Sequence, residues 1–129
     1  MPPEAQKKKI LVVEDDIFMV DLLSKELQGA GFDIVVAHNG TEGVEKFKGV
    51  APDLILLDLF LPDLNGFEVL RQIRQDPVGY TTKVMVLSNA SEEQNIKEAQ
   101  RLNVIEYLIK ANFSLPEVVE KIRKVLETV

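Results

Sequence analysis

The sequence ILVVEDD at residues 10–16 joins four consecutive apolar residues to three acidic ones. A short, unbroken apolar run of this kind is typical of a strand buried on both faces of a parallel sheet. Three later segments have the same form: LILL at 54–57 ends at Asp58, VMVL at 84–87 ends at Ser88, and YLI at 107–109 ends at Lys110.

Parallel strands point the same way, so the polar residues that follow these runs are expected to meet at one edge of a sheet. In open α/β sheets this edge is where ligands bind. The side chains brought together would be three carboxylates, one hydroxyl and one ammonium: Glu14, Asp15, Asp58, Ser88 and Lys110. Such a set suits a divalent cation and a phosphoryl group.

The composition places the chain in one globular domain. It has 129 residues, of which 46% are hydrophobic and 28% charged, which is enough for one core and too little for two ordinary domains. The net charge of −6 argues against direct nucleic-acid binding, and no apolar run is long enough to span a membrane. We expect a flexible tail over residues 1–8 and one domain over residues 9–129. The chain lacks cysteine, so disulfides and thiolate metal sites are excluded, and a reducing compartment is allowed but not required. The location that we expect is the cytoplasm.

Strands and helices alternate along the sequence. The five expected strands cover residues 9–14, 33–37, 54–57, 84–87 and 105–109, and a helix is expected after each. This alternation predicts parallel pairing with right-handed crossovers. The fold class is therefore α/β: a doubly wound five-stranded parallel sheet of order 2-1-3-4-5, flavodoxin-like, with five helices.

The helix boundaries also carry signals. The first helix repeats apolar residues at Ile17, Val20, Leu23 and Leu27, which predicts one buried face. Asp15 or Asp16 is expected to cap its start, and Asn39 or Thr41 the start of the second helix. The sequences SEEQ at 91–94 and SLPE at 114–117 predict capping boxes at the last two helices.

The complete pattern resembles the receiver domain of bacterial response regulators in two-component signalling. Glu14-Asp15 matches that family's acidic pair, Asp58 its phosphoacceptor, Ser88 its hydroxyl residue and Lys110 its lysine. The loop LPDLNG at 61–66 is similar to the family's loop after the phosphoacceptor, and Tyr107 lies at the position of its switch aromatic. The resemblance extends over residues 9–127.

The resemblance implies a role for each residue. Asp58 would take the phosphoryl group, with Ser88 and Lys110 contacting it. Mg²⁺ would be held by Asp15, Asp58 and the backbone carbonyl of Phe60, with Glu14 acting through water. Ser88 and Tyr107 would form the switch.

The sequence departs from the family pattern at three positions. Ala111 follows Lys110 where the family usually has a cis proline, and because a cis bond before a non-proline residue costs about 3–4 kcal/mol, we predict a trans peptide. Asn89 stands where a small residue is more usual. Phe60 is bulky and apolar, and it would shield the acyl phosphate from attacking water.

The function expected from this resemblance is phosphorylation of Asp58 by a sensor histidine kinase or a phosphotransfer protein. The resulting change of conformation would act on an output partner through the last two helices and the last strand. The protein would catalyse only its own phosphorylation and dephosphorylation, so it is not expected to be an ordinary enzyme.

Alternatives from other classes remain at this point. One is a phosphorylation-independent protein-interaction module with a receiver fold, which would not become labelled at Asp58. A flavin-binding domain is disfavoured because Glu14-Asp15-Asp16 would repel a phosphate after the first strand, and a phosphohydrolase would show multiple turnover on a phosphoester.

Overall fold

The structure is a computed structural model in which residues 7–127 are described. Most of the expected tail, residues 1–6, lies outside the described residues, as do residues 128 and 129. Five strands form the sheet: β1 (Lys9–Val13), β2 (Asp33–Ala37), β3 (Leu54–Leu57), β4 (Lys83–Ser88) and β5 (Glu106–Ile109). Five α-helices and one short 3-10 helix connect them: α1 (Ile17–Gly29), α2 (Gly40–Val50), α3 (Gly66–Gln75), α4 (Glu93–Arg101), η1 (Lys110–Asn112) and α5 (Leu115–Glu127).

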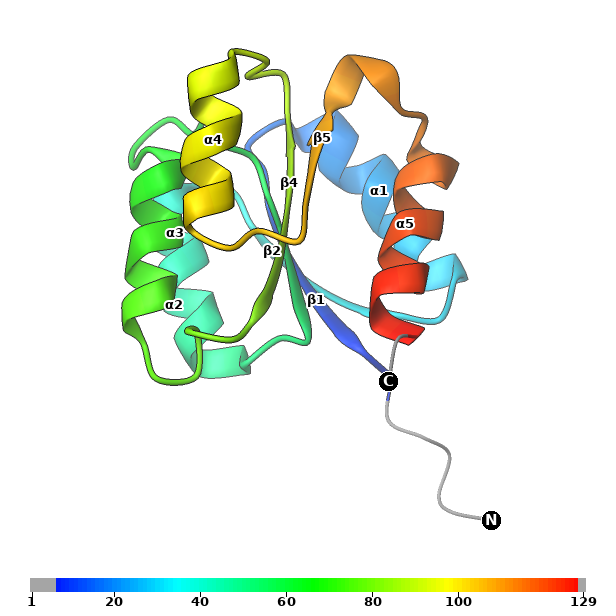
Figure 1. Cartoon of the computed structure of the whole chain (residues 1–129). Helices are drawn as coiled ribbons and strands as arrows, with labels where there is room; N and C mark the ends of the chain where they lie inside the picture. The colour runs from blue at the N-terminus through cyan, green and yellow to red at the C-terminus, as the bar shows by residue number, and fades with distance from the viewer. Residues whose placement is uncertain (1–6, 128–129) are drawn as a thin grey trace.

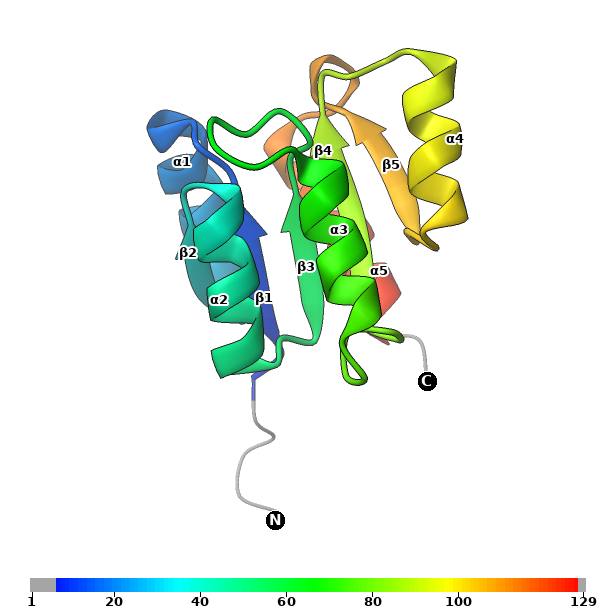
Figure 2. The same ribbon diagram turned by 90° about the vertical axis from the view of Figure 1, so that its left-hand side faces the viewer.

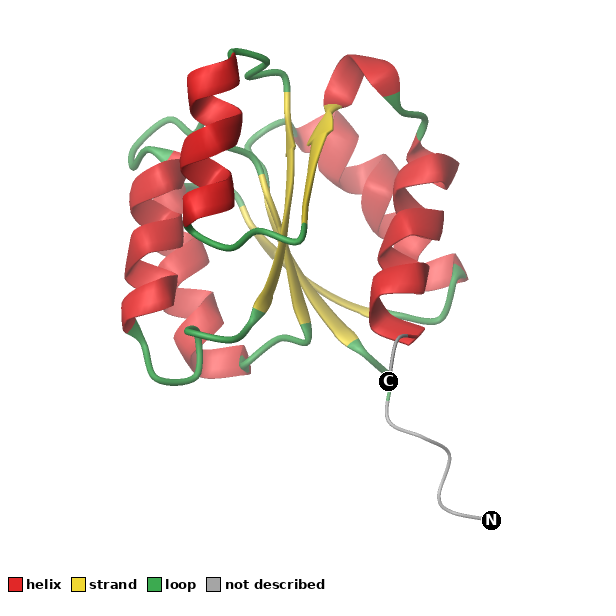
Figure 3. Ribbon diagram, in the orientation of Figure 1, coloured by secondary structure: helices red, strands yellow, loops and turns green. Residues whose placement is uncertain are grey.

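All strand pairs are parallel, and the order in the sheet is β2-β1-β3-β4-β5. The predicted fold class and strand order are therefore confirmed. Helices α2, α3 and α4 cover one face of the sheet, and α1 and α5 cover the other (Figure 1). The three layers are clearest when helices and strands are coloured separately (Figure 3).

Side chains on the two faces of the sheet form two separate cores. Because β1, β3 and β4 are covered on both faces, every residue of β3 is buried, as the unbroken apolar run predicts. One core joins alternate residues of these strands to Phe47, Leu70 and Ile73 from the helices α2 and α3. The other joins the remaining strand residues to Leu23 and Ile122, from α1 and α5.

Most predicted helix boundaries are confirmed by side-chain caps. Asp16 accepts a 3.1 Å hydrogen bond from the backbone N–H of Met19, and Asn39 accepts one of 2.8 Å from that of Glu42. Ser114 and Glu117 form the predicted capping box, since each side chain accepts a hydrogen bond from the other residue's backbone N–H.

Two predictions about the helices are wrong. The capping box at Ser91 does not form, because α4 begins at Glu93 behind Glu92, which makes no side-chain cap. Ile17 was expected on the buried face of α1, but its side chain is 71% exposed. It occupies the first position of the helix, ahead of Val20, which is the first buried residue of α1.

The described residues include no helix that is long and apolar enough to cross a membrane. At the start of the described chain the carbonyl of Lys8 accepts a 2.9 Å hydrogen bond from Asp33, so pairing between the two segments already begins before β1.

Candidate functional site

The register of the sheet brings the polar ends of four strands together. Val13 lies beside Leu57, and Leu57 lies beside Val86. Ser88 lies beside Ile109 at the end of the last pair. The residues that follow β1, β3 and β5 are Glu14, Asp58 and Lys110. They therefore lie at one edge of the sheet, as the sequence predicts.

Three of the predicted residues form an acidic cluster. Glu14, Asp15 and Asp58 each place a carboxylate oxygen within 4.8 Å of the others. Glu14 and Asp58 are buried, at 3% and 5% exposure, whereas Asp15 is exposed. A cluster of carboxylate oxygens, partly open to solvent, fits a small hard cation such as Mg²⁺, which prefers oxygen ligands and retains several waters.

Lys110 lies between two members of this cluster. Its Nζ is 2.7 Å from Oε1 of Glu14 and 3.1 Å from Oδ2 of Asp58. Burial alone would lower the pKa of Lys110, but the hydrogen bond to Glu14 and the nearby carboxylate charges outweigh it and raise that pKa. The ammonium therefore stays charged beside Asp58, where it can neutralise an incoming anionic group.

Glu14 is the most perturbed acid of the cluster. Burial raises its pKa from 4.5 to about 7, and the charge of Asp58 adds to this, while the hydrogen bond from Lys110 acts in the opposite direction. The loss of solvent around Glu14 is therefore a larger cause of its raised pKa than the crowding of carboxylates.

The two predicted switch residues converge on Ala90. Ser88 is fully buried, and its Oγ accepts a 3.2 Å hydrogen bond from the backbone N–H of Ala90. Tyr107, on β5, donates a 2.6 Å hydrogen bond from its hydroxyl to the carbonyl of the same residue. The loop that leads to α4 is thus attached both to the end of β4 and to β5.

Asp58 is the first residue of the loop after β3. The backbone N–H of Phe60 donates a 3.1 Å hydrogen bond to Oδ1 of Asp58, while the Phe60 side chain is 60% exposed. Gly66, which begins α3, is packed so closely that a Cβ there would collide with the backbone of Leu59 and lie 2.8 Å from the carbonyl oxygen of Asp58. Any larger residue at this position would displace the backbone that carries the Asp58 carboxylate.

The segment after Lys110 is a turn of 3-10 helix, closed by a hydrogen bond from Phe113 to the Lys110 carbonyl. There is no cis peptide bond in the described chain, so the predicted trans bond between Lys110 and Ala111 is confirmed. Asn89 is exposed beside the buried Ser88.

Two features of the site were missed in the sequence. Lys110 contacts Glu14 at 2.7 Å and Asp58 at 3.1 Å, whereas from the sequence it was expected only to contact the transferred phosphoryl group. Asp63 lies in the loop after β3 and accepts hydrogen bonds from the start of α2. The sequence signal for it was weak, because an aspartate after a proline is also an ordinary turn residue.

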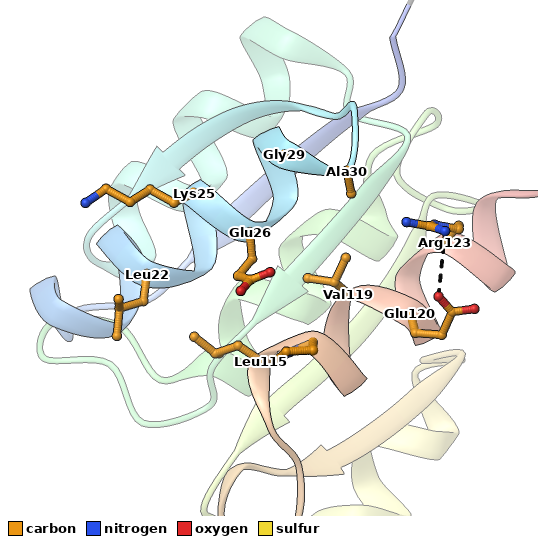
Figure 4. Close-up of a pocket in the computed structure, with 10 residues that line it drawn as sticks. Leu22, Lys25, Glu26, Gly29, Ala30, Leu115, Val119, Glu120 and Arg123 are labelled. Atoms are coloured by element: carbon orange, nitrogen blue, oxygen red, sulfur yellow. Dashed lines mark ion pairs between the residues drawn. The ribbon is translucent and has the colours of Figure 1, made fainter.

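A separate groove lies between α1 and α5 (Figure 4). Its lining includes Leu22, Leu115 and Val119, with Arg123 paired to Glu120 at 3.8 Å. It shares no lining residue with the acidic cluster, so it is not part of the candidate site.

Comparison with known proteins agrees with the geometry. The sequence profile of the response regulator receiver domain matches residues 10–123. The chain is 36% identical over 119 residues to the alkaline phosphatase synthesis transcriptional regulatory protein PhoP of Bacillus subtilis, covering 92% of this chain and 48% of that protein. It is 32% identical over 120 residues to the chemotaxis protein CheY of Thermotoga maritima, covering 92% and 97%.

Solved structures show the same fold. The Mn²⁺-bound form of response regulator Rcp1 is 30% identical, with a TM-score of 0.83 and coverage of 95% of this chain and 96% of that one. The chemotaxis protein CheY4 of Vibrio cholerae, at 24% identity, has a TM-score of 0.86 and coverage of 93% and 99%. The chain spans about half the length of PhoP and of two other curated relatives, TrcR and ArlR. The family match covers most of the chain, including β2 to β5 in full and all of β1 except its first residue, and the chain belongs to the response regulator receiver domains of two-component signalling.

Proposed function

We propose that this domain accepts a phosphoryl group on Asp58 from the phosphohistidine of a sensor histidine kinase or phosphotransfer protein. The carrying observation is the position of Asp58, a buried carboxylate 3.1 Å from the ammonium of Lys110 and within the acidic cluster. One Asp58 oxygen attacks phosphorus, the bond from phosphorus to the donor nitrogen breaks, and the imidazole leaves with that electron pair. Receiver domains modify themselves in this way and are not ordinary enzymes that act on a separate substrate.

We assign Mg²⁺ to Asp15, Asp58 and the backbone carbonyl of Phe60, with Glu14 acting through water. When bound, the ion would neutralise charge on the transferring group. The oxygen donor set of the cluster supports this assignment, as does the Mn²⁺ bound by the related Rcp1. Lys110 would supply the second positive charge, and the Ser88 hydroxyl would donate a hydrogen bond to a phosphoryl oxygen.

Titration of Mg²⁺ by calorimetry tests the metal assignment. Asp15→Asn should weaken binding, because it replaces a charged ligand of the cluster with a neutral amide. Asp16→Asn is the matched control, since it removes the same charge one residue away, and an amide can still cap α1. Equal affinity in both variants would mean that Asp15 is not a ligand.

Phosphorylation would change the loop before α4, because a hydrogen bond donated by Ser88 to a phosphoryl oxygen would draw Ser88 toward Asp58, and the Oγ of Ser88 also accepts a hydrogen bond from the N–H of Ala90. Tyr107 would follow, since it binds the carbonyl of the same residue. The output partner would bind α4, β5 and α5 and detect the change there, since the loop leads into α4 and is bonded to β5 through Tyr107. The phosphoryl group would thus favour one of two conformers of this loop and shift the population of the protein toward it.

The phosphodonor would approach over the exposed apolar side chains beside the acidic cluster. Ile17 and Phe18 follow the acidic pair at the start of α1 and are 71% and 84% exposed, and Phe60 is 60% exposed. Adjacent exposed apolar residues of this size indicate a contact surface.

On family grounds we also expect a cytoplasmic location.

Hydrogen exchange with and without a beryllofluoride mimic of the phosphoryl group distinguishes this function from the phosphorylation-independent module. With Mg²⁺ and beryllofluoride, exchange at residues 89–92 and along α4 should change, while exchange along α2 should not. An identical exchange pattern in both conditions would favour the phosphorylation-independent module.

A further inference from the structure

Asp63 connects the loop after β3 to the first turn of α2. Its Oδ1 accepts a 2.7 Å hydrogen bond from the backbone N–H of Gly40, and its Oδ2 accepts one of 3.1 Å from that of Thr41. The side chain of Thr41 adds a further hydrogen bond, the largest cause that holds the pKa of Asp63 below its usual range. Figure 2 shows the loop arching from the end of β3 toward the beginnings of α1 and α2.

The loop and the helix meet without space between them. A Cβ at Gly40 would lie 2.6 Å from the Cβ of Leu64 and 2.7 Å from its carbonyl oxygen. Glycine is therefore required at the start of α2 for the loop to approach. Leu64 and Gly40 are already as close as packing allows, and the hydrogen bonds to Asp63 attach the loop to α2 at the same place. Together these contacts fix the position of the loop relative to α2.

The segment between Asp63 and Phe60 is too short and too stiff to absorb a displacement. Only Leu61 and Pro62 separate the two residues. Proline fixes its own φ and restricts the residue before it. At the other end, the N–H of Phe60 is bonded to Asp58. Movement at Asp63 therefore changes the orientation of the Phe60 peptide relative to Asp58.

We propose that Asp63 is a positioning residue for the phosphorylation site, which holds the Phe60 carbonyl in the direction needed for Mg²⁺ binding by fastening its loop to α2. The proposal rests on the function proposed above, in which that carbonyl is a metal ligand. Asp63 itself is exposed and is not a member of the acidic cluster. Its effect therefore reaches the metal through the loop backbone.

Calorimetric titration with Mg²⁺ alone, on the full chain at a temperature where every variant is folded, tests this role. Asp63→Ala should raise the Mg²⁺ dissociation constant about tenfold, a loss typical of residues that orient metal ligands. Asp76→Ala is the matched control, because Oδ1 of Asp76 also accepts two backbone hydrogen bonds, at 2.8 and 3.3 Å. Asp76 follows the C-terminal end of α3, whereas Asp63 precedes its N-terminal end. It should lower stability without changing the dissociation constant.

A further variant separates positioning from long-range charge. Thr41→Val retains the charge of Asp63 but removes one of its hydrogen bonds, and it should weaken Mg²⁺ binding in the same direction by a smaller factor. If only Asp63→Ala weakens binding, and the effect disappears in high salt, Asp63 acts through its charge and the positioning role is overturned.

The wild-type titration distinguishes a failure of the proposed metal site from a failure of the positioning role of Asp63. If the wild-type protein does not bind Mg²⁺, the metal site of the proposed function fails, and the role of Asp63 fails with it. If the wild type binds Mg²⁺ and Asp63→Ala binds it equally well, only the role of Asp63 is wrong.

Discussion

The hydroxyl of Tyr107 donates a 2.6 Å hydrogen bond to the carbonyl of Ala90, and so joins β5 to the loop that follows Ser88. The N–H of the same Ala90 is bonded to the Ser88 side chain. One peptide segment is therefore held both by Ser88, at the end of β4, and by a residue on the face that we assign to the output partner. A displacement of Ser88 would therefore reach that face through the two hydrogen bonds made by Ala90.

Tyr107→Phe should release this loop from β5. The variant removes one hydrogen bond, which should lower the free energy of unfolding by about 0.5–1.5 kcal/mol. Hydrogen exchange at residues 89–92 should become faster, while exchange along α2 stays unchanged. If protection of the loop is the same in both proteins, Tyr107 does not hold it, and the route to the output face is wrong.

Mg²⁺ affinity should fall as the pH falls from 8 to 6. The pKa of Glu14 is raised to about 7, and in the proposed metal site Glu14 would contribute only when it is ionised. Its ionised fraction drops about tenfold between these pH values, so the dissociation constant should rise by up to about tenfold. Calorimetry in buffers of different ionisation heat should detect proton release near pH 7. An affinity that is constant over this range would exclude Glu14 from metal binding.

The raised pKa of Glu14 also predicts how the stability of the metal-free protein depends on pH. Because the folded pKa of Glu14 lies above its ordinary value of 4.5, the folded state binds more protons than the unfolded chain between pH 4.5 and about 7. The contribution to stability is full below this window and is lost as the pH rises through it. Urea unfolding should therefore show a decline in stability from pH 5 to pH 8 that is weaker in Glu14→Gln.

Phe60→Asn should shorten the lifetime of phosphorylated Asp58. A phenyl ring offers no hydrogen bond to orient a hydrolytic water, whereas an amide can hold one in line. Lowering the hydrolysis barrier by about 1.4 kcal/mol corresponds to roughly tenfold faster decay. Tyr80→Asn, which changes another exposed aromatic residue in the loop before β4, is the control. A decay rate that is unchanged or slower in Phe60→Asn would show that Phe60 does not control access of water.

Whether a feature of this site could be predicted from the sequence depends on how far apart in the chain its residues lie and on what brings them together. Asp58 and Lys110 follow apolar strands, and the parallel order of the sheet determines that they meet. The Ser114 capping box is local, so four adjacent residues define it. At Ser91 the same local pattern was misleading, because α4 begins two residues later behind an uncapped Glu92.

Interactions between distant loops were not predictable in this way. Asp63 bonds to the N–H groups of Gly40 and Thr41, more than 20 residues earlier in the chain, and these donors are backbone groups that every sequence contains. The contact of Lys110 with Glu14 depends on the burial of that carboxylate, which the alternation of strands does not reveal. Topology could be predicted from patterns, whereas these contacts required coordinates.

The central claim is that Asp58 takes the phosphoryl group, and the most direct measurement is labelling of the purified protein by a small phosphodonor with Mg²⁺. Intact-mass analysis should show one added phosphoryl group on the wild type, and peptide mapping should place it on Asp58. Label should be absent without Mg²⁺ and in Asp58→Asn, because an amide is a poor nucleophile, while Asp53→Asn should label normally. A wild-type protein that takes no label, or an Asp58→Asn variant labelled to the same extent, would contradict the claim.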